Sequence, residues 1–296
     1  MVKYEGLDLL HVHYAIPHAI AAYTARQILA GEGITIPVVT TLHGTDITLV
    51  GRDSTFEPAV TFSINNSDAV TAVSQYLKDE TCRYFKIKKD IHVIPNFVDF
   101  ERFSKKSKEH FKIALAPNGE KILVHTSNFR AIKRIDDILE VFKILRETVP
   151  AKLLLVGDGP ERSRLELLSR SMGISQDVRF LGKIEAVEEV LSIADLFLLT
   201  SGKESFGLAA LEAMACQVPV ISSDAEGIPE VNVNGVTGFV SAVGDVEDMA
   251  RNAIEILKDE ATHKKFKQAA YDRAKEFDLS IIMGMYENIY KSLVKR

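Results

Sequence analysis

Two glutamates eight residues apart, Glu204 and Glu212, mark the segment of this 296-residue chain whose residue types could do the most specific chemistry. Glu204 follows the apolar run from Leu196 to Thr200, and Gly207 lies between the two carboxylates. If these residues form a strand, a tight loop and a helix, a carboxylate lies beside the free N–H groups of the helix N-terminus. Such N–H groups favour phosphate. At about 1.5 Å per residue, Glu212 lies about 8 Å along that helix from Gly207. The segment predicts a site for a sugar hydroxyl beside a diphosphate, unless Glu204 only caps the helix and Glu212 is only exposed.

Three cations gather after a second apolar run, which predicts a strand over Lys121–Ser127. Arg130, Lys133 and Arg134 follow this run and precede a segment of helical period. Positive charge at that place could neutralise a departing diphosphate, the main requirement when a sugar leaves a nucleotide. The alternative is a basic turn in solvent, and Arg134 alone could be a surface charge of the helix.

Two further strand ends carry candidate residues. Gly157 opens a Gly-Asp-Gly-Pro turn that would let a ligand approach the backbone closely, although such turns after strands are common. His43 ends the strand expected at Val38–His43, at the edge where open parallel sheets bind ligands. A lone histidine there could also be structural, and Asp46 could simply cap the next helix.

The elements that must position these residues alternate between short apolar runs and longer segments of helical period. Strands are predicted at Leu7–His13, Val38–His43, Ala69–Val73, Ile91–Ile94, Lys121–Ser127, Lys152–Val156, Val178–Leu181, Leu196–Thr200, Pro219–Ser222 and Gly238–Ser241. Helices are predicted at Ile16–Leu29, Ile135–Thr148, Glu161–Met172, Val246–Lys258 and Leu279–Lys295. This alternation predicts α/β domains with parallel sheets and right-handed crossovers.

A polar stretch without a strong period, Phe100–Gly119, predicts a linker between two such domains. The chain is long enough for both domains to have a core of their own. We expect a first domain over residues 1–102, a second over 103–278, and a helix over 279–296 that crosses back to the first. The site is expected in the crevice between the domains.

The bulk composition excludes several classes of function. Hydrophobic residues make up 46% of the chain and charged residues 26%, as in soluble globular proteins, and the net charge of −5 does not favour nucleic acid. No apolar run reaches the length of a membrane span and no secretory signal opens the sequence, which predicts a cytoplasmic protein without stable membrane association. Cys82 and Cys216 lack metal-ligand spacing, and no Asp-x-Asp motif ends a strand, so no metal site is predicted.

The string KESFGLAALEAMACQVP, from Lys203 to Pro219, closely resembles the Glu-x7-Glu signature of the retaining nucleotide-sugar transferases of glycosyltransferase family 4 (GT4). The resemblance implies the GT-B fold, with two Rossmann-like doubly wound domains. The family's first strand and glycine-rich loop are not in the sequence, so an incomplete first domain and a truncated gene model are expected. The resemblance implies that the catalytic residues are His43, Glu204, Lys133 and Arg130, the last replacing the usual arginine at the position of Asn128.

The same resemblance implies a set of donor-binding residues, namely Phe206, Gly207, Leu208, Glu212, Gly157 and Asn128. It implies no cofactor and no essential metal. The family commonly has glycine where this chain has Gln217 and Glu226. Gln217 is expected to lack the favourable helix C-terminus that glycine would provide. Glu226 is expected to weaken donor binding modestly through its extra negative charge.

The string HVHYAIPHA, from His11 to Ala19, together with HGTDIT and SNFR, narrows the resemblance to members that transfer N-acetylglucosamine from UDP-GlcNAc to L-malate, the first step of bacillithiol synthesis. That implies Tyr14 and Thr45 as contacts of the malate, a small dicarboxylate, and it implies a homodimer. Tyr14 could instead be a packing residue. Two other functions stay open at this point: a GT4 transferase for a polysaccharide or lipid acceptor, and a non-catalytic fragment that binds a nucleotide sugar.

Overall fold

The computed structural model describes residues 2–49, 53, 55–104 and 109–294. The chain divides into two compact units, residues 1–96 with 280–296 and residues 97–279. This division falls after Asn96, before the expected boundary at residue 102, and it groups the last helix with the first unit. Each unit is built on a parallel sheet, so the predicted α/β class is confirmed.

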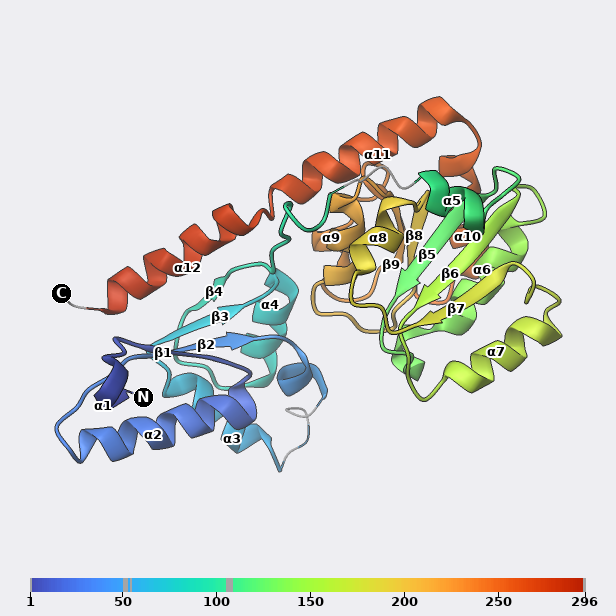
Figure 1. The fold of residues 1–296 in the computed structure, drawn as a ribbon. Helices are drawn as coiled ribbons and strands as arrows, with labels where there is room; N and C mark the ends of the chain where they lie inside the picture. Colours follow the sequence, from blue (N-terminus) through green and yellow to red (C-terminus); the bar gives the residue numbers. More distant parts are fainter. Residues whose placement is uncertain (1, 50–52, 54, 105–108, 295–296) are drawn as a thin grey trace. The chain divides into compact units, whose positions relative to one another are not determined.

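The first unit contains a four-stranded parallel sheet in the order β1-β2-β3-β4 (Figure 1). Because the chain moves in one direction along this sheet, right-handed crossovers place α2, α3 and α4 on the same face. The other face is covered by α12, whose Tyr290 hydroxyl lies 2.7 Å from Nδ1 of His11 on β1. The elements of this unit are α1 (Val2–Glu5), β1 (Leu10–His13), η1 (Ala15–Ala19), α2 (Ile20–Ala30), β2 (Val38–Leu42), η2 (Thr45–Leu49), α3 (Glu57–Asn65), β3 (Ala69–Ala72), α4 (Gln75–Tyr84), β4 (Ile91–Val93) and α12 (Leu279–Leu293).

The second unit contains a six-stranded parallel sheet in the order β10-β9-β8-β5-β6-β7. From β5 to β7 the chain moves one way along the sheet, and after β7 it returns to the other side of β5. Right-handed crossovers therefore place α6 and α7 on one face and α8 and α9 on the other. The elements of this unit are α5 (Glu109–Leu115), β5 (Lys121–Thr126), η3 (Ala131–Lys133), α6 (Ile135–Leu145), β6 (Ala151–Val156), α7 (Arg162–Ser171), β7 (Val178–Gly182), α8 (Val187–Ser192), β8 (Leu196–Leu199), α9 (Leu208–Ala215), β9 (Val220–Ser223), η4 (Ile228–Glu230), β10 (Gly238–Ser241), α10 (Val246–Leu257) and α11 (Glu260–Lys275).

The core of the second unit lies between its sheet and the helices on each face. The central strands β8 and β9 are buried at every residue, as expected when helices cover both faces of a parallel sheet. On one face α10 packs against α6, and on the other α11 packs against α9. This two-sided cover fixes the strand ends, and hence the loops that leave them.

The predicted linker over Phe100–Gly119 is wrong in part, because it contains the helix α5. Nζ of Lys112 on this helix lies 2.8 Å from the carboxylate of Asp195, which also accepts the Ile122 N–H at 2.9 Å. Phe103 and Ala116 on either side of the helix are buried. The segment is therefore part of the second unit's fold, and its polar composition concealed it because the helix has only two turns.

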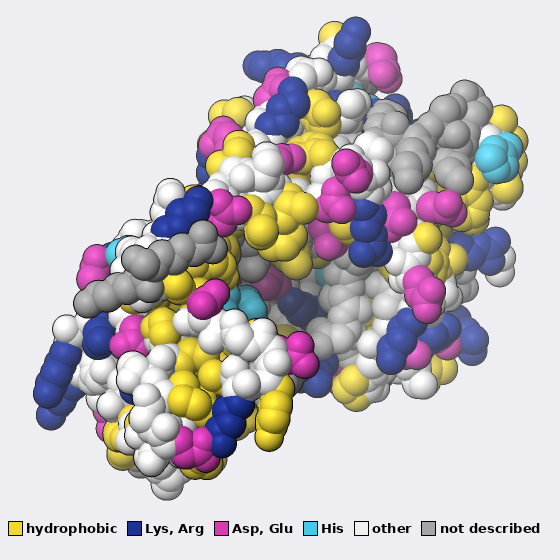
Figure 2. Space-filling view, turned by 60° about the vertical axis from the view of Figure 1, so that its left-hand side comes forward, with side chains coloured by type: hydrophobic (Ala, Val, Ile, Leu, Met, Phe, Trp, Pro, Cys, Tyr) yellow, Lys and Arg dark blue, Asp and Glu magenta, His cyan; other side chains and the backbone are white. Residues whose placement is uncertain are grey.

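Charges of both signs are mixed on one face of the molecule. Figure 2 shows Lys and Arg side chains interspersed with Asp and Glu on the face that it displays, without one large basic patch. Among the described residues, no helix is both long and apolar enough to cross a membrane.

The close approach of β10 to β9 requires glycine at position 238. A Cβ atom on Gly238 would lie 1.7 Å from the carbonyl oxygen of Val220, a backbone atom that cannot move aside. Gly284 in α12 is the opposite case, because a Cβ there would meet nothing within 4 Å.

We therefore expect Gly238→Ala to lower the free energy of unfolding by about 2–3 kcal/mol, the usual effect of forcing an extra methyl group into a filled space. Gly284→Ala is the matched control and should raise it by up to about 1 kcal/mol, because alanine is the better helix former. Thermal and urea denaturation followed by circular dichroism measure both. Equal stability of the two variants would contradict the register of β10.

Candidate functional site

The site in the second unit forms where the strand order reverses, between β5 and β8. The loop after β5 and the loop after β8 meet here, because the two strands are neighbours in the sheet. The Gly202 N–H donates to the Ile132 carbonyl at 2.8 Å, and the Thr200 hydroxyl lies 3.1 Å from the Lys133 carbonyl oxygen. Such reversals are where open α/β sheets bind ligands, beyond the carboxyl ends of the strands.

Lys133 and Glu204 are brought together at this point. Nζ of Lys133 lies 2.5 Å from Oε2 of Glu204, and both side chains are 20% exposed. The Ser201 hydroxyl is 3.5 Å from the same carboxylate oxygen. Glu204 therefore does not cap α9, and the basic loop is not simply a turn in solvent. The pair holds one positive and one negative group where a ligand can reach them.

The N-terminus of α9 lies three residues beyond Glu204. Gly207 is the N-cap, with a φ of 97° that favours glycine, and no side chain caps the helix. Within the described part of the chain, the N–H groups of Leu208 and Ala209 form no hydrogen bond. These free donors suit an anionic group. The Phe206 ring is buried against Phe277, so Phe206 can offer a ligand only its main chain.

Glu212 is a half-buried carboxyl group on the second turn of α9. Among the described residues its side chain has no hydrogen-bond partner, so the sequence alternative of a merely exposed glutamate does not hold. Burial raises its pKa to about 7, with Arg102 opposing the shift and Glu188 adding to it. The group therefore changes charge near neutral pH and can accept a hydrogen bond from a ligand hydroxyl.

The remaining predicted residues of this unit differ in their environment. Asn128 and Arg130 are exposed, and within the described chain neither side chain forms a hydrogen bond. Arg134 pairs with Asp137 at 2.7 Å at the start of α6, as expected of a helix charge. At Gly157 a Cβ atom would lie 1.8 Å from the Ser127 carbonyl oxygen, so glycine is required there by the packing of two loops.

In the first unit, His43 belongs to a histidine cluster that the sequence analysis did not foresee. Its Nε2 lies 2.8 Å from Nδ1 of His13, and its ring lies 5.0 Å from that of Tyr14. Burial, followed by the neighbouring His13 and His11, lowers the pKa of His43 to about 4. At neutral pH it is therefore an uncharged hydrogen-bonding group. The signal was the His-x-His spacing on β1, since residues i and i+2 of a strand share a face.

His11 extends the cluster towards α12. Its two ring nitrogens lie 2.7 Å from the Tyr290 hydroxyl and 2.7 Å from the Thr41 hydroxyl. Burial, and then His13, lower the pKa of His11 to about 4. Because these contacts join β1 to α12 and to β2, His11 has a structural role.

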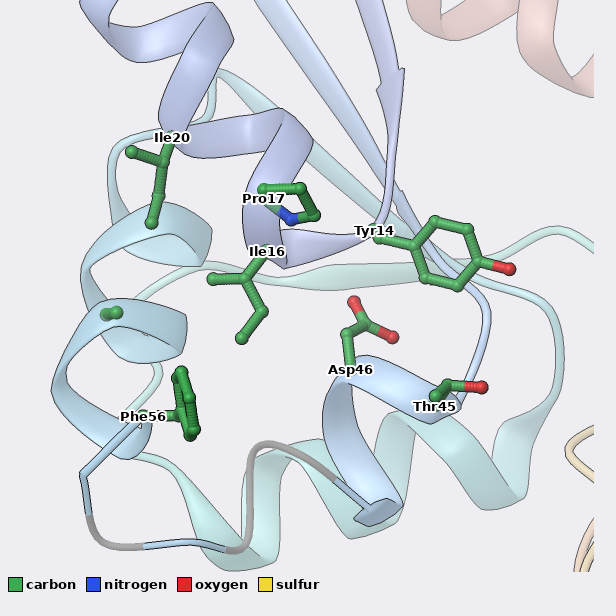
Figure 3. Close-up of a pocket in the computed structure, with 8 residues that line it drawn as sticks. Tyr14, Ile16, Pro17, Ile20, Thr45, Asp46 and Phe56 are labelled. Atoms are coloured by element: carbon green, nitrogen blue, oxygen red, sulfur yellow. The ribbon is translucent and has the colours of Figure 1, made fainter.

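Tyr14 and Thr45 line a pocket of about 570 Å³ beside this cluster. Figure 3 shows Ile16, Ile20 and Phe56 grouped around one space, while the Tyr14 and Thr45 hydroxyls lie beyond Asp46 and point away from that space. Within the described lining there is no lysine or arginine, so the lining offers no cation for a carboxylate. The lining consists of Tyr14, Ile16, Pro17, Ile20, Thr45, Asp46, Phe56 and Ala59.

Asp46 is the only acidic residue in the described lining, and the alternative that it only caps the next helix does not hold. Its buried carboxylate accepts the Ala15 N–H at 2.6 Å and the Gly44 N–H at 3.3 Å. It thus ties the loop after β1 to the loop after β2. Burial raises its pKa, and the backbone hydrogen bonds oppose that shift.

Both parts of the chain match models of glycosyltransferase families. Residues 1–102 match the model described as Glycosyltransferase Family 4, and residues 106–273 match the model described as Glycosyl transferases group 1. A curated relative, the N-acetyl-alpha-D-glucosaminyl L-malate synthase of Bacillus anthracis, is 46% identical over 98% of this chain and 76% of its own length.

Solved structures show the same fold. The sucrose-phosphate synthase from Thermosynechococcus elongatus aligns with a TM-score of 0.85 at 23% identity, over 99% of this chain and 75% of that chain. Anabaena HepE in complex with UDP and glucose aligns with a TM-score of 0.79 at 22% identity, over 94% of this chain and 77% of that chain. At these identities the likeness concerns the fold alone.

The raised pKa of Glu212 predicts a pH-dependent stability. Its pKa is about 7 in the folded state against 4.5 ordinarily, so ionising it opposes folding as the pH rises from 4.5 to 7. At pH 8 the opposition reaches about 3 kcal/mol. Glu212→Gln should then be more stable than the wild type at pH 8 and equal to it at pH 4. Thermal unfolding at both pH values measures this, with the exposed Glu140→Gln as control. A gain that is the same at both pH values would contradict the burial of this carboxyl group.

Proposed function

The chain belongs to glycosyltransferase family 4, and on this premise we propose that it transfers N-acetylglucosamine from UDP-GlcNAc to L-malate with retention, the first step of bacillithiol synthesis. The observation that carries the proposal is the 46% identity over 98% of the chain to a synthase with that named product. The meeting of Lys133 and Glu204 at the strand-order reversal supports it, because both a cation and a carboxylate are needed beside a sugar diphosphate.

In this mechanism the proposed site residues of the second unit act on the donor. Lys133 and the free N–H groups at the start of α9 neutralise the charge that develops on the leaving diphosphate. Glu204 binds a hydroxyl of the transferred sugar, and Glu212 binds a hydroxyl elsewhere on the donor. An oxygen of the leaving diphosphate accepts the proton of the attacking hydroxyl on the same face of the sugar. Arg130 and Asn128 remain proposed donor contacts in the exposed loop after β5.

The residues of the first unit serve the sugar and the acceptor. The neutral imidazole of His43 orients the transferred sugar through a hydrogen bond, and it does not act as a nucleophile. Tyr14 and Thr45 offer hydroxyls to the acceptor. A dicarboxylate also needs cationic partners, which must come from outside the described lining of the pocket.

The same pocket is the observation that favours the second candidate, a GT4 transferase for a lipid or polysaccharide acceptor. Its described walls are mostly apolar, with Ile16, Ile20 and Phe56 around the space. An acceptor with an apolar part would fill them better than malate would. The identity to the malate synthase outweighs this, and the acceptor dependence of turnover decides between them.

We propose that the protein is a cytoplasmic homodimer. Cys82 is exposed and Cys216 is buried, and neither forms a disulfide, which suits a reducing compartment. The mass in solution, measured by light scattering during size-exclusion chromatography, tests the oligomeric state.

UDP release should depend on L-malate when UDP-GlcNAc is the donor. Glu204→Gln should lower the turnover by at least about 100-fold, the usual loss when one transition-state contact is removed. Glu140→Gln, an exposed substitution of the same kind, should leave turnover unchanged. A coupled UDP assay with and without malate measures both. Release that ignores malate but rises with a lipid or glycan acceptor would favour the second candidate.

We also expect the donor to bind without a divalent metal, because Lys133 and the N–H groups of α9 supply the positive charge that a metal would supply. Isothermal titration of UDP-GlcNAc in EDTA and in Mn²⁺ should give dissociation constants that agree within about twofold. A strict requirement for Mn²⁺ would contradict this part of the proposal. Lys133→Met is the matched variant and should weaken binding in both buffers.

A further inference from the structure

The main chain of Glu204 is held at both of its polar groups by one loop, which follows β9. The Glu204 N–H donates to Oε2 of Glu226 at 3.0 Å. The Glu204 carbonyl accepts the N–H of the next residue, Gly227, at 2.9 Å. Two adjacent residues thus fix the peptide groups on either side of the Cα atom of Glu204.

The loop packs directly against the main chain that follows Glu204. A Cβ atom on Gly227 would lie 2.1 Å from the Ser205 carbonyl oxygen, so the two backbones are in direct contact. The Glu226 carboxylate therefore reaches the Glu204 N–H from a fixed place. Its position depends on the backbone of Glu226 itself.

That backbone is in a conformation that disfavours a residue with a side chain. Glu226 has a φ of 51°, in the left-handed region where glycine is preferred. Strained residues of this kind persist where the surrounding structure or the function requires them. Glycine would remove the strain here but would leave the Glu204 N–H without its carboxylate partner.

The main chain and the side-chain carboxylate of Glu204 are thus fixed by different residues. Glu226 and Gly227 fix its main chain, and Lys133 fixes its carboxylate at 2.5 Å. A catalytic group that is held in place before the ligand arrives loses less freedom on binding. This arrangement opposes the expectation that Glu226 only repels an anionic donor.

We propose that Glu226 is a positioning residue for Glu204, which holds the main chain so that the Glu204 carboxylate meets the sugar of the donor. The inference rests on the proposed function, because it takes UDP-GlcNAc as the ligand of Glu204. Repulsion predicts tighter donor binding when the Glu226 charge is removed, whereas positioning predicts weaker binding by the glycine variant and nearly unchanged binding by the glutamine variant.

The test compares Glu226→Gly and Glu226→Gln by isothermal titration with UDP-GlcNAc and by thermal unfolding. Glu226→Gly should raise the dissociation constant about tenfold while the unfolding temperature stays equal or rises, because the strain is removed. Glu226→Gln should stay within about threefold of the wild type, because its side-chain oxygen can still accept the Glu204 N–H. The matched control is Gln217→Gly, which relieves a φ of 61° elsewhere in the unit and should leave donor binding unchanged.

A second measurement separates positioning from a general loss of structure. In a Glu204→Ala background, Glu226→Gly should have no further effect on donor binding, because the group that it positions is gone. A full tenfold effect in that background would overturn the inference. Unchanged binding by Glu226→Gly, binding by Glu226→Gln that is tighter by more than about threefold, or a joint fall of stability and affinity would overturn it as well. A wild-type chain that does not bind UDP-GlcNAc would instead overturn the proposed function, and this inference with it.

Discussion

The hydrogen bonds and the ion pair between the loops that follow β5 and β8 are the contact on which the candidate site depends. They form because the chain reverses its direction along the sheet between these strands, so the two loops leave the same edge as neighbours. The hydrogen bond from the Gly202 N–H to the Ile132 carbonyl sets the separation of the loop backbones. The Lys133–Glu204 ion pair then joins the side chains of the two loops. The N-terminus of α9 lies a few residues beyond Glu204. The Lys133 ammonium group, the Glu204 carboxylate and the N–H donors of α9 are therefore close together in space.

The candidate site residues of the two units differ in their surroundings. In the second unit Lys133 and Glu204 stay partly exposed, and Glu212 keeps an unpartnered carboxyl group within the described chain. In the first unit burial keeps His11 and His43 uncharged, and Asp46 is bound by backbone N–H groups. A neutral histidine beside a neutral histidine can share one proton in a hydrogen bond without repulsion, which is why His13 and His43 can lie 2.8 Å apart.

Much of the fold could be predicted from the sequence, because its strands are short apolar runs that end at glycine, proline or polar residues. All ten predicted strands overlap the observed ones, and β8 with its run LFLL is a clear example. The helix α5 could not be found in this way, since it is short and none of its described side chains is fully buried. The meeting of Lys133 with Glu204 could be expected from the strand ends that carry them, whereas the sheet order that makes them neighbours could not be read from periodicity. The bond between His11 and Tyr290 joins residues 279 positions apart, and no local pattern indicates it. The sequence indicates Glu226 only as a departure from the family's usual glycine, because its proposed role depends on the φ angle of its backbone.

The order in which the helices on the two faces of the first unit's sheet are synthesised affects how the chain folds. Right-handed crossovers put α2, α3 and α4 on one face, and the other face is covered by α12, which is synthesised after the entire second unit. The second unit is continuous in sequence, so the ribosome can release all of it before the first sheet receives its last helix. Until then His11, Thr41 and their neighbours remain open to water or to chaperones. The first unit therefore starts folding first and finishes last, with a loop of nearly two hundred residues to close.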